Sequence, residues 1–179
     1  MFLPTLAITS LIVLLASFTS AVKPPPAAQQ LKDLIAAGNY SDPATLHKIF
    51  NALPPAEMRT VWGTYKGLDL TPNPAFPDTI GWWGKRFLNE SFVDPLLGTR
   101  NTTSGPVVYT YPRANIAQMR EITFRGKSAA AIVYDKTPIM DYFRRVDGKT
   151  LLGLGDEKGK PLGPFFLLTK TVGQVVVEI

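Results

Sequence analysis

Residues 128–146 read SAAAIVYDKTPIMDYFRRV, and this stretch decides the fold class. Ser128–Tyr134 and Ile139–Val146 are rich in Ala, Ile, Val, Tyr and Phe, and Pro138 lies in the short turn between them. Two such runs joined by a polar turn are typical of a β-hairpin. In the first run, residues of both parities are apolar, which predicts a strand that is buried on both faces.

Seven further segments have the same character, and Gly or Pro separates most of them. They are Gly63–Asp69, Thr79–Leu88, Val107–Tyr111, Ala117–Arg125, Thr150–Gly155, Phe165–Lys170 and Gln174–Ile179. Turn pairs such as Asp147-Gly148 are typical of antiparallel hairpins. About eight antiparallel strands predict either a sandwich or a closed barrel. We favour the barrel because closure removes exposed strand edges.

Two short helices are predicted before the strands. Leu31, Leu34 and Ile35 recur at helical spacing, and Asp42 is placed to cap a second helix that has Pro43 at its first position. We therefore expect a mostly β protein. The expected architecture is a small antiparallel β-barrel with short N-terminal helices, preceded by a signal peptide.

The composition fits one packed domain and excludes several kinds of site. The chain has 179 residues, 45% of them hydrophobic, with no Cys and a single His. Disulfides, thiolate metal sites and cysteine nucleophiles are therefore excluded, and so are multi-His metal centres. The net charge of +5 is scattered along the chain, so we expect no nucleic-acid partner. We also expect no metal and no cofactor.

An apolar segment at the N-terminus predicts export. Residues 2–22 contain no charged side chain, and small residues precede a cleavage site after Ala21. We therefore expect residues 1–21 to be a signal peptide and the protein to be secreted. The alternative is a signal anchor that holds the protein in a membrane through residues 2–22, and only this alternative implies a membrane partner.

Secretion gives meaning to three N-glycosylation sequons. They begin at Asn39, Asn89 and Asn101. Asn101 lies in a stretch rich in Gly, Thr and Ser, so we expect it in a surface loop that carries a glycan.

Two blocks of the sequence resemble a known family. Gly63-Thr64-Tyr65-Lys66-Gly67 and the following Gly81–Phe87 are similar to the signature of the GXWXG protein family, with Tyr65 in place of the Trp of its name. Residues 119–156 resemble its companion, domain of unknown function 4334, in a long ordered match that includes Tyr134–Arg144.

This resemblance implies one small calycin-like or lipocalin-like barrel. The helices and a spacer occupy residues 22–52, the GXWXG-like part occupies residues 53–100, and the companion part occupies residues 101–179. Both parts are expected to form the same barrel. The resemblance implies no particular reaction.

Aromatic and basic side chains predict a ligand-binding wall on the first strands. The expected ligand contacts are Tyr65, Trp82, Trp83, Lys85, Arg86 and Phe87. Lys85 and Arg86 have opposite parity in a strand, so one of them is expected to face the barrel interior and meet an anionic head group. The alternative is a charge that reaches solvent beside an aromatic rim. Tyr65 also fits a purely structural role in the core.

Polar residues on the predicted hairpin 128–146 supply the candidate catalytic groups. They are Tyr134, Asp135, Asp141 and Arg144. Asp141 and Arg144 have opposite parity, whereas Tyr134 with Arg144, or Asp135 with Asp141, are predicted to be able to pair. Two close carboxylates would raise the pKa of one of them and suit general acid catalysis. The alternative is that these groups cap turns and fix the register of the hairpin.

Two functions follow from these expectations. The first is binding of a small hydrophobic or amphiphilic ligand, such as a lipid or fatty acid, in the barrel lumen. The second is a cofactor-independent isomerase or cyclase that acts on a hydrophobic metabolite with Asp and Tyr as acid and base. Carboxylates that face a closed pocket would favour the enzyme. A secreted effector that binds another protein is a third alternative.

Overall fold

The computed structural model describes residues 26–40, 42–71, 81–111 and 117–178. The predicted signal peptide, residues 1–21, lies outside these residues, and so does the whole of the alternative anchor, residues 2–22. Within the described part, no helix has the length and apolar character needed to cross a membrane.

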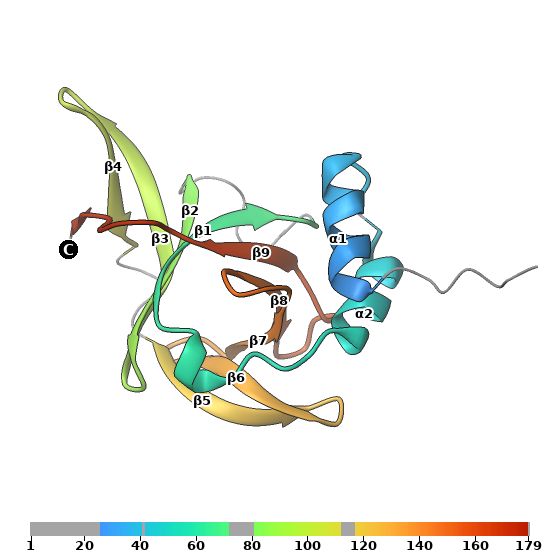
Figure 1. Cartoon of the computed structure of the whole chain (residues 1–179). Helices are drawn as coiled ribbons and strands as arrows, with labels where there is room; N and C mark the ends of the chain where they lie inside the picture. The colour runs from blue at the N-terminus through green and yellow to red at the C-terminus, as the bar shows by residue number, and fades with distance from the viewer. Residues whose placement is uncertain (1–25, 41, 72–80, 112–116, 179) are drawn as a thin grey trace, which may run out of the picture.

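Eight antiparallel strands close a barrel, as the sequence predicts (Figure 1). In order around the barrel they are β1 (Gly63–Asp69), β9 (Phe165–Lys170), β8 (Thr150–Glu157), β7 (Ile139–Arg145), β6 (Lys127–Tyr134), β5 (Ala117–Phe124), β3 (Phe92–Thr102) and β2 (Trp82–Asn89). The ring closes where β3 pairs with β5, with Val93 opposite Ala117.

The strand β3 is missing from the sequence-based prediction because Pro95 and Gly98 interrupt its apolar pattern. Its second half leaves the barrel and pairs with β4 (Gly105–Thr110), whose other edge carries the short parallel strand β10 (Val177–Glu178). This hairpin projects from the barrel in Figure 1. The expectation of a loop at Asn101 is wrong, since Asn101 belongs to β3, where its side chain is exposed.

The helices α1 (Ala27–Ala36) and α2 (Pro43–Ala52) pack beside the outer face of the barrel (Figure 1). As predicted, the Asp42 carboxylate caps α2 by accepting hydrogen bonds from the N–H groups of Ala44 and Thr45. The apolar side of α2 forms one core cluster with side chains of β8 and β9. A 3₁₀ turn, η1 (Met58–Thr60), then leads into β1.

A second cluster fills the inside of the barrel at one end, and we call it the packed floor. At its centre are the rings of Tyr65, Phe87 and Phe143, which are separated by 5.2 Å and 5.5 Å between neighbours. Apolar side chains surround them, namely Val61, Met119, Ile132, Leu151 and Leu168. Side chains therefore occupy this part of the lumen.

Candidate functional site

A cavity of about 80 Å³ lies inside the barrel next to the packed floor. Its apolar walls are Trp82, Leu96, Ile139, Pro164 and Phe166, and three of its polar side chains are Lys85, Tyr134 and Asp141. The remaining lining residues are Gly155, Gly163 and the acidic residues Asp69, Asp156 and Glu157.

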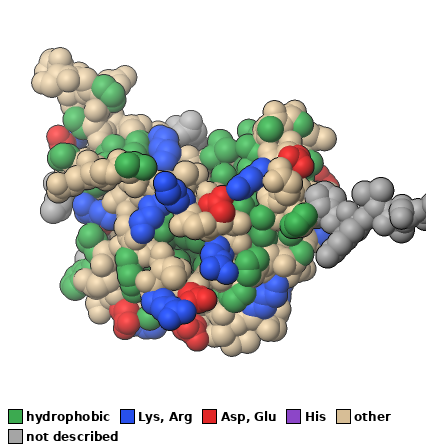
Figure 2. All heavy atoms as spheres, viewed as in Figure 1, with side chains coloured by type: hydrophobic (Ala, Val, Ile, Leu, Met, Phe, Trp, Pro, Cys, Tyr) green, Lys and Arg blue, Asp and Glu red, His purple; other side chains and the backbone are tan. Residues whose placement is uncertain are grey.

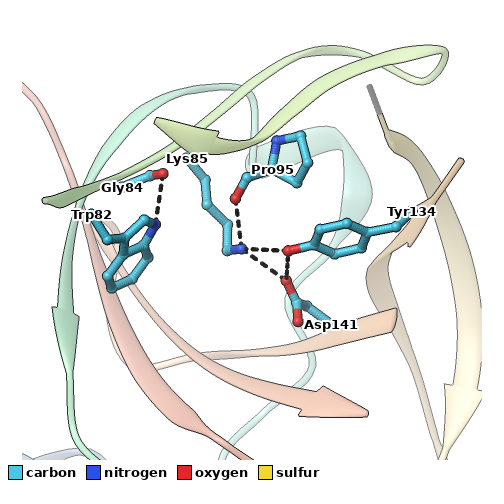
Figure 3. A network of polar contacts seen from close by, with 6 residues as sticks. All are labelled: Trp82, Gly84, Lys85, Pro95, Tyr134 and Asp141. Atoms are coloured by element: carbon cyan, nitrogen blue, oxygen red, sulfur yellow. Dashed lines mark hydrogen bonds and ion pairs between the residues drawn. The ribbon is translucent and has the colours of Figure 1, made fainter. Parts of the chain in front are cut away.

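The three polar side chains form one buried cluster, the Lys85–Tyr134–Asp141 cluster (Figure 3). The Lys85 Nζ atom lies 2.9 Å from Asp141 Oδ2 and 3.0 Å from the Tyr134 hydroxyl oxygen. The Tyr134 hydroxyl donates to Asp141 Oδ2 at 3.0 Å. Lys85 and Asp141 are 2% and 3% exposed. An ion pair and a phenol are therefore held out of water in a cavity lined both by apolar side chains and by further acidic residues.

A β-bulge positions Lys85 and its fourth partner. Gly84 pairs with Leu97 and Arg86 pairs with Asp94, so two residues of β3 lie opposite Lys85 alone. One of them is Pro95, whose carbonyl oxygen accepts a hydrogen bond from Lys85 Nζ at 2.8 Å. A proline has no N–H to lose from the ladder, which makes it suitable for a bulge.

Two glycines make room for the aromatic walls of the cavity. A Cβ atom at Gly67 would lie 2.3 Å from the Trp82 ring, and a Cβ atom at Gly153 would lie 2.2 Å from the Phe166 ring. The Trp82 indole is also fixed by a hydrogen bond from Nε1 to the Gly84 carbonyl oxygen, at 3.0 Å. The second glycine of the Gly-x-Tyr-x-Gly motif therefore sets the place of one cavity wall.

Electrostatics keep the Tyr134 phenol protonated. Burial, and then the charge and hydrogen bond of Asp141, raise the pKa of Tyr134 well above its ordinary value. The hydroxyl is consequently a hydrogen-bond donor at every pH near neutrality. The Lys85 ammonium also lies 4.8 Å from the centre of the Phe166 ring, which is a favourable cation–π distance.

Of the six predicted ligand contacts, Trp82 and Lys85 line the cavity. Lys85 and Arg86 face opposite sides of the sheet, as the parity argument predicts, and Lys85 is the one that faces inward. Arg86 Nε pairs with Asp94 at 2.5 Å. Tyr65 and Phe87 belong to the packed floor, and burial raises the pKa of Tyr65 to about 12. Trp83 lies away from the cavity, with Lys66 Nζ 5.0 Å from its ring centre.

Of the four predicted catalytic groups, Tyr134 and Asp141 line the cavity. The predicted pairings of Tyr134 with Arg144 and of Asp135 with Asp141 are wrong. Asp141 pairs in register with Ile132, so Tyr134 has the same parity and reaches Asp141 itself. Asp135 is exposed and accepts a hydrogen bond from Gln118 Nε2 at 3.2 Å.

Arg144 has a structural position on the other face of the sheet. It is fully buried, its guanidinium lies 4.7 Å from the centre of the Phe50 ring of α2, and it donates to the Phe124 carbonyl oxygen at 2.8 Å. It therefore joins α2 to the barrel and does not reach the cavity.

An open groove of about 490 Å³ adjoins the cavity at the turn between β6 and β7. Cavity and groove share Tyr134, Ile139 and Asp156, and the groove adds Val133, Thr137, Pro138, Met140 and Lys158. The Thr137 Oγ1 atom is buried and has no hydrogen-bond partner among the described residues. The Thr137 hydroxyl is therefore able to form a hydrogen bond with a molecule in the groove.

Side chains of both charges lie on the face that Figure 2 shows, and the described residues form no cluster of metal ligands. In Figure 2, basic and acidic side chains are interspersed over the face shown and are not gathered by sign. Within the described ranges, no three His, Cys, Asp or Glu side chains are close enough together to hold a metal ion.

Comparison with known proteins places the chain. It matches the GXWXG protein family over residues 48–102 and the domain of unknown function DUF4334 over residues 115–170. Its fold is similar to the crystal structure of a protein from Thermomonospora curvata, with 34% sequence identity and a TM-score of 0.69, over 82% of this chain and 99% of that chain. No protein with a curated functional description matches it. With both segments matched in order and folded into one barrel, the chain belongs to the family of GXWXG proteins that carry a DUF4334 domain.

Proposed function

We propose that the protein binds a small amphiphilic molecule, whose polar head enters the cavity and whose apolar body lies in the adjoining groove. The observation that carries this proposal is the Lys85–Tyr134–Asp141 cluster, buried in a cavity that also has apolar walls. Burial of an ion pair costs desolvation free energy that apolar side chains of similar volume would avoid. Placed at a cavity, such a cluster suits recognition of one polar group.

The volumes of the cavity and the groove indicate which part of the ligand each one holds. The cavity of about 80 Å³ is far smaller than the ~300–1,000 Å³ of most ligand pockets, so it has room for a compact head group. The packed floor blocks deeper entry, which excludes a long chain inside the lumen. The groove of about 490 Å³ is the place for the apolar body. Binding at the mouth of a barrel is also what a calycin-like architecture supports.

The three tryptophans provide the test. Trp82 lines the cavity, Trp62 packs against the floor, and Trp83 lies away from the cavity. In a titration with hexan-1-ol followed by NMR, the indole N–H resonance of Trp82 is expected to shift and saturate, while that of Trp83 stays in place. Equal shifts of all three indoles, or no shift, would contradict the proposal.

A matched pair of variants adds a control. Ile139→Trp fills the cavity and is expected to abolish the shift of the Trp82 resonance. Leu88→Trp adds the same side chain at a position that is 54% exposed and lines neither hollow, so binding should persist.

One observation favours a second candidate, a cofactor-independent proton-transfer enzyme. The Asp141 carboxylate lines the cavity, where it could take a proton from a bound ligand while Lys85 and Tyr134 stabilise the resulting anion. Native mass spectrometry of the purified protein, followed by incubation of the recovered ligand with protein in D₂O, separates the two. Recovery of the unchanged, undeuterated ligand supports binding, and deuterium uptake or an isomer supports the enzyme.

We also propose that the protein is secreted and glycosylated. The side chains of Asn39, Asn89 and Asn101 are all exposed, as attachment of a glycan requires. Support for secretion comes from the apolar residues 2–22.

A further inference from the structure

Every side-chain donor at the cavity already has an acceptor (Figure 3). An ammonium group carries three N–H bonds. Those of Lys85 meet three oxygens, the Pro95 carbonyl at 2.8 Å, Asp141 Oδ2 at 2.9 Å and the Tyr134 hydroxyl at 3.0 Å. The Tyr134 proton goes to Asp141, and the Trp82 N–H goes to the Gly84 carbonyl oxygen. Among the described lining residues, no other side chain is a donor.

The backbone around the cavity is satisfied in the same way. The Gly155 N–H donates to the Pro164 carbonyl oxygen at 3.0 Å, and the Gly163 N–H donates to the Gly155 carbonyl oxygen at 2.9 Å. Pro164 itself has no N–H. These turns therefore add no free donor to the cavity.

Acceptors, by contrast, are in excess. A carboxylate offers about four lone-pair sites. Lys85 and Tyr134 both bind Oδ2 of Asp141, and Oδ1 takes part in none of the hydrogen bonds among the described residues. Asp156 accepts one hydrogen bond, from the Tyr142 hydroxyl at 3.3 Å, and keeps further capacity. The cavity consequently presents oxygen acceptors to whatever enters it.

We infer that the head group of the ligand is a hydrogen-bond donor, a hydroxyl or an amine, and not a carboxylate. This inference rests on the proposed binding function. A hydrogen-bond donor on the ligand can bind the free lone pairs of Asp141 Oδ1. A carboxylate has only acceptor oxygens, and in the cavity they would meet the acceptor oxygens of Asp141 and Asp156. To be bound, it would have to displace one of the present partners of Lys85. The inference replaces the anionic head group expected from the sequence, which assumed that the inward lysine is free.

A matched series of hexyl compounds tests the inference on the intact protein. Hexan-1-ol and hexylamine donate hydrogen bonds, hexyl methyl ether only accepts them, and hexanoate accepts them and is charged. The shift of the Trp82 indole resonance reports the affinity of each. We expect hexan-1-ol to bind about tenfold more tightly than the ether, as one hydrogen bond to a charged acceptor allows. Hexylamine should bind at least as tightly as hexan-1-ol, and hexanoate most weakly.

Tyr134→Phe changes the donor count in a predictable direction. Without the hydroxyl, Lys85 has one N–H to spare and Asp141 Oδ2 has one more free lone pair. Hexanoate, which needs a donor, should therefore bind about tenfold more tightly to this variant than to the unaltered protein, and the ratio of these two affinities is the readout. Tyr109→Phe removes a hydroxyl from β4, at a residue that lines neither hollow, and should leave the ratio unchanged.

The outcomes separate this inference from the proposed function. If none of the four compounds shifts the Trp82 resonance, the proposed function itself fails. If they bind but hexanoate is tightest, or the ether equals the alcohol, binding stands and the donor inference is overturned. A Tyr134→Phe variant that weakens all four compounds equally would overturn the account of Lys85. If that variant does not fold, the series on the unaltered protein still decides.

Discussion

Replacing Asp141 by Leu should destabilise the protein far more than replacing Asp141 and Lys85 together. In Asp141→Leu, the Lys85 ammonium stays buried at 2% exposure and loses the opposite charge 2.9 Å away. An unpaired charge left in this way costs about 3–5 kcal/mol of unfolding free energy. Lys85→Met should cost a similar amount, because the buried Asp141 carboxylate then loses its opposite charge and keeps only the neutral Tyr134 hydroxyl as a partner.

The double variant Lys85→Met/Asp141→Leu removes both charges and fills the space with apolar groups. Such replacements of a buried pair are often neutral or stabilising, so its unfolding free energy should lie within about 1 kcal/mol of the unaltered protein, or above it. If the two single effects were independent, they would instead add to roughly 6–10 kcal/mol. The two outcomes differ by more than the error of the measurement.

Urea unfolding followed by circular dichroism measures these free energies, and an unchanged m-value shows that the variants unfold from the same compact state. Glu57→Gln is the control, since it breaks a pair with Arg59 in which the Arg side chain is 83% exposed, and it should cost less than about 1 kcal/mol. An additive double variant, or an Asp141→Leu variant as stable as the unaltered protein, would refute the buried ion pair and with it the saturated state of Lys85.

Three further predictions follow from other parts of the molecule. Gly67→Ala should push the Trp82 ring out of place, because the added Cβ would lie 2.3 Å from it. Binding of hexan-1-ol should then be lost. Retained binding with an unshifted Trp82 indole resonance would contradict the role of this glycine. Burial, and then the charge of Arg125, lower the pKa of His47 in the folded protein. The unfolded chain therefore binds a proton at His47 more readily than the folded protein does. The stability of the protein should consequently fall as the pH drops below about 6.5 and through the lowered pKa of His47. His47→Gln should flatten that part of the pH–stability curve, and an unchanged slope would show that another group causes it. In a eukaryotic host, the secreted protein should begin at Val22 and lose mass on enzymatic removal of N-glycans; an intact chain found only in membranes would support the anchor instead.

Local patterns predict a strand best where strand-forming residues follow one another without interruption. The run Ser128–Tyr134 and the run Phe165–Lys170 contain neither Gly nor Pro, and both are found within a residue of their predicted bounds. The cap of α2 at Asp42 was predictable for the same reason, since the cap and the helix are adjacent in the chain. The strand β3 was not predictable in this way, because Pro95 marks a bulge that has meaning only when β2 lies beside it.

The candidate site was predicted in pieces but not as a unit. Parity alone showed that Lys85 and Arg86 point to opposite faces, yet it did not show which of them faces inward. Parity within one strand also separated Asp141 from Arg144. The register between β6 and β7, which joins Tyr134 to Asp141, depends on hydrogen bonds across the sheet and has no local signature.

The two family segments meet in this cluster, and neither segment can bury its own charge without the other. Lys85 and the Pro95 carbonyl come from the segment 48–102, whereas Tyr134 and Asp141 come from the segment 115–170. In a separated segment each charge would stay in water, so burial of the ion pair requires both segments. The closing contact between β3 and β5 joins the same two segments, with Val93 opposite Ala117. Closure of the barrel and assembly of the cluster therefore depend on the same two segments, and a chain that has lost either segment should lose the cavity as a whole.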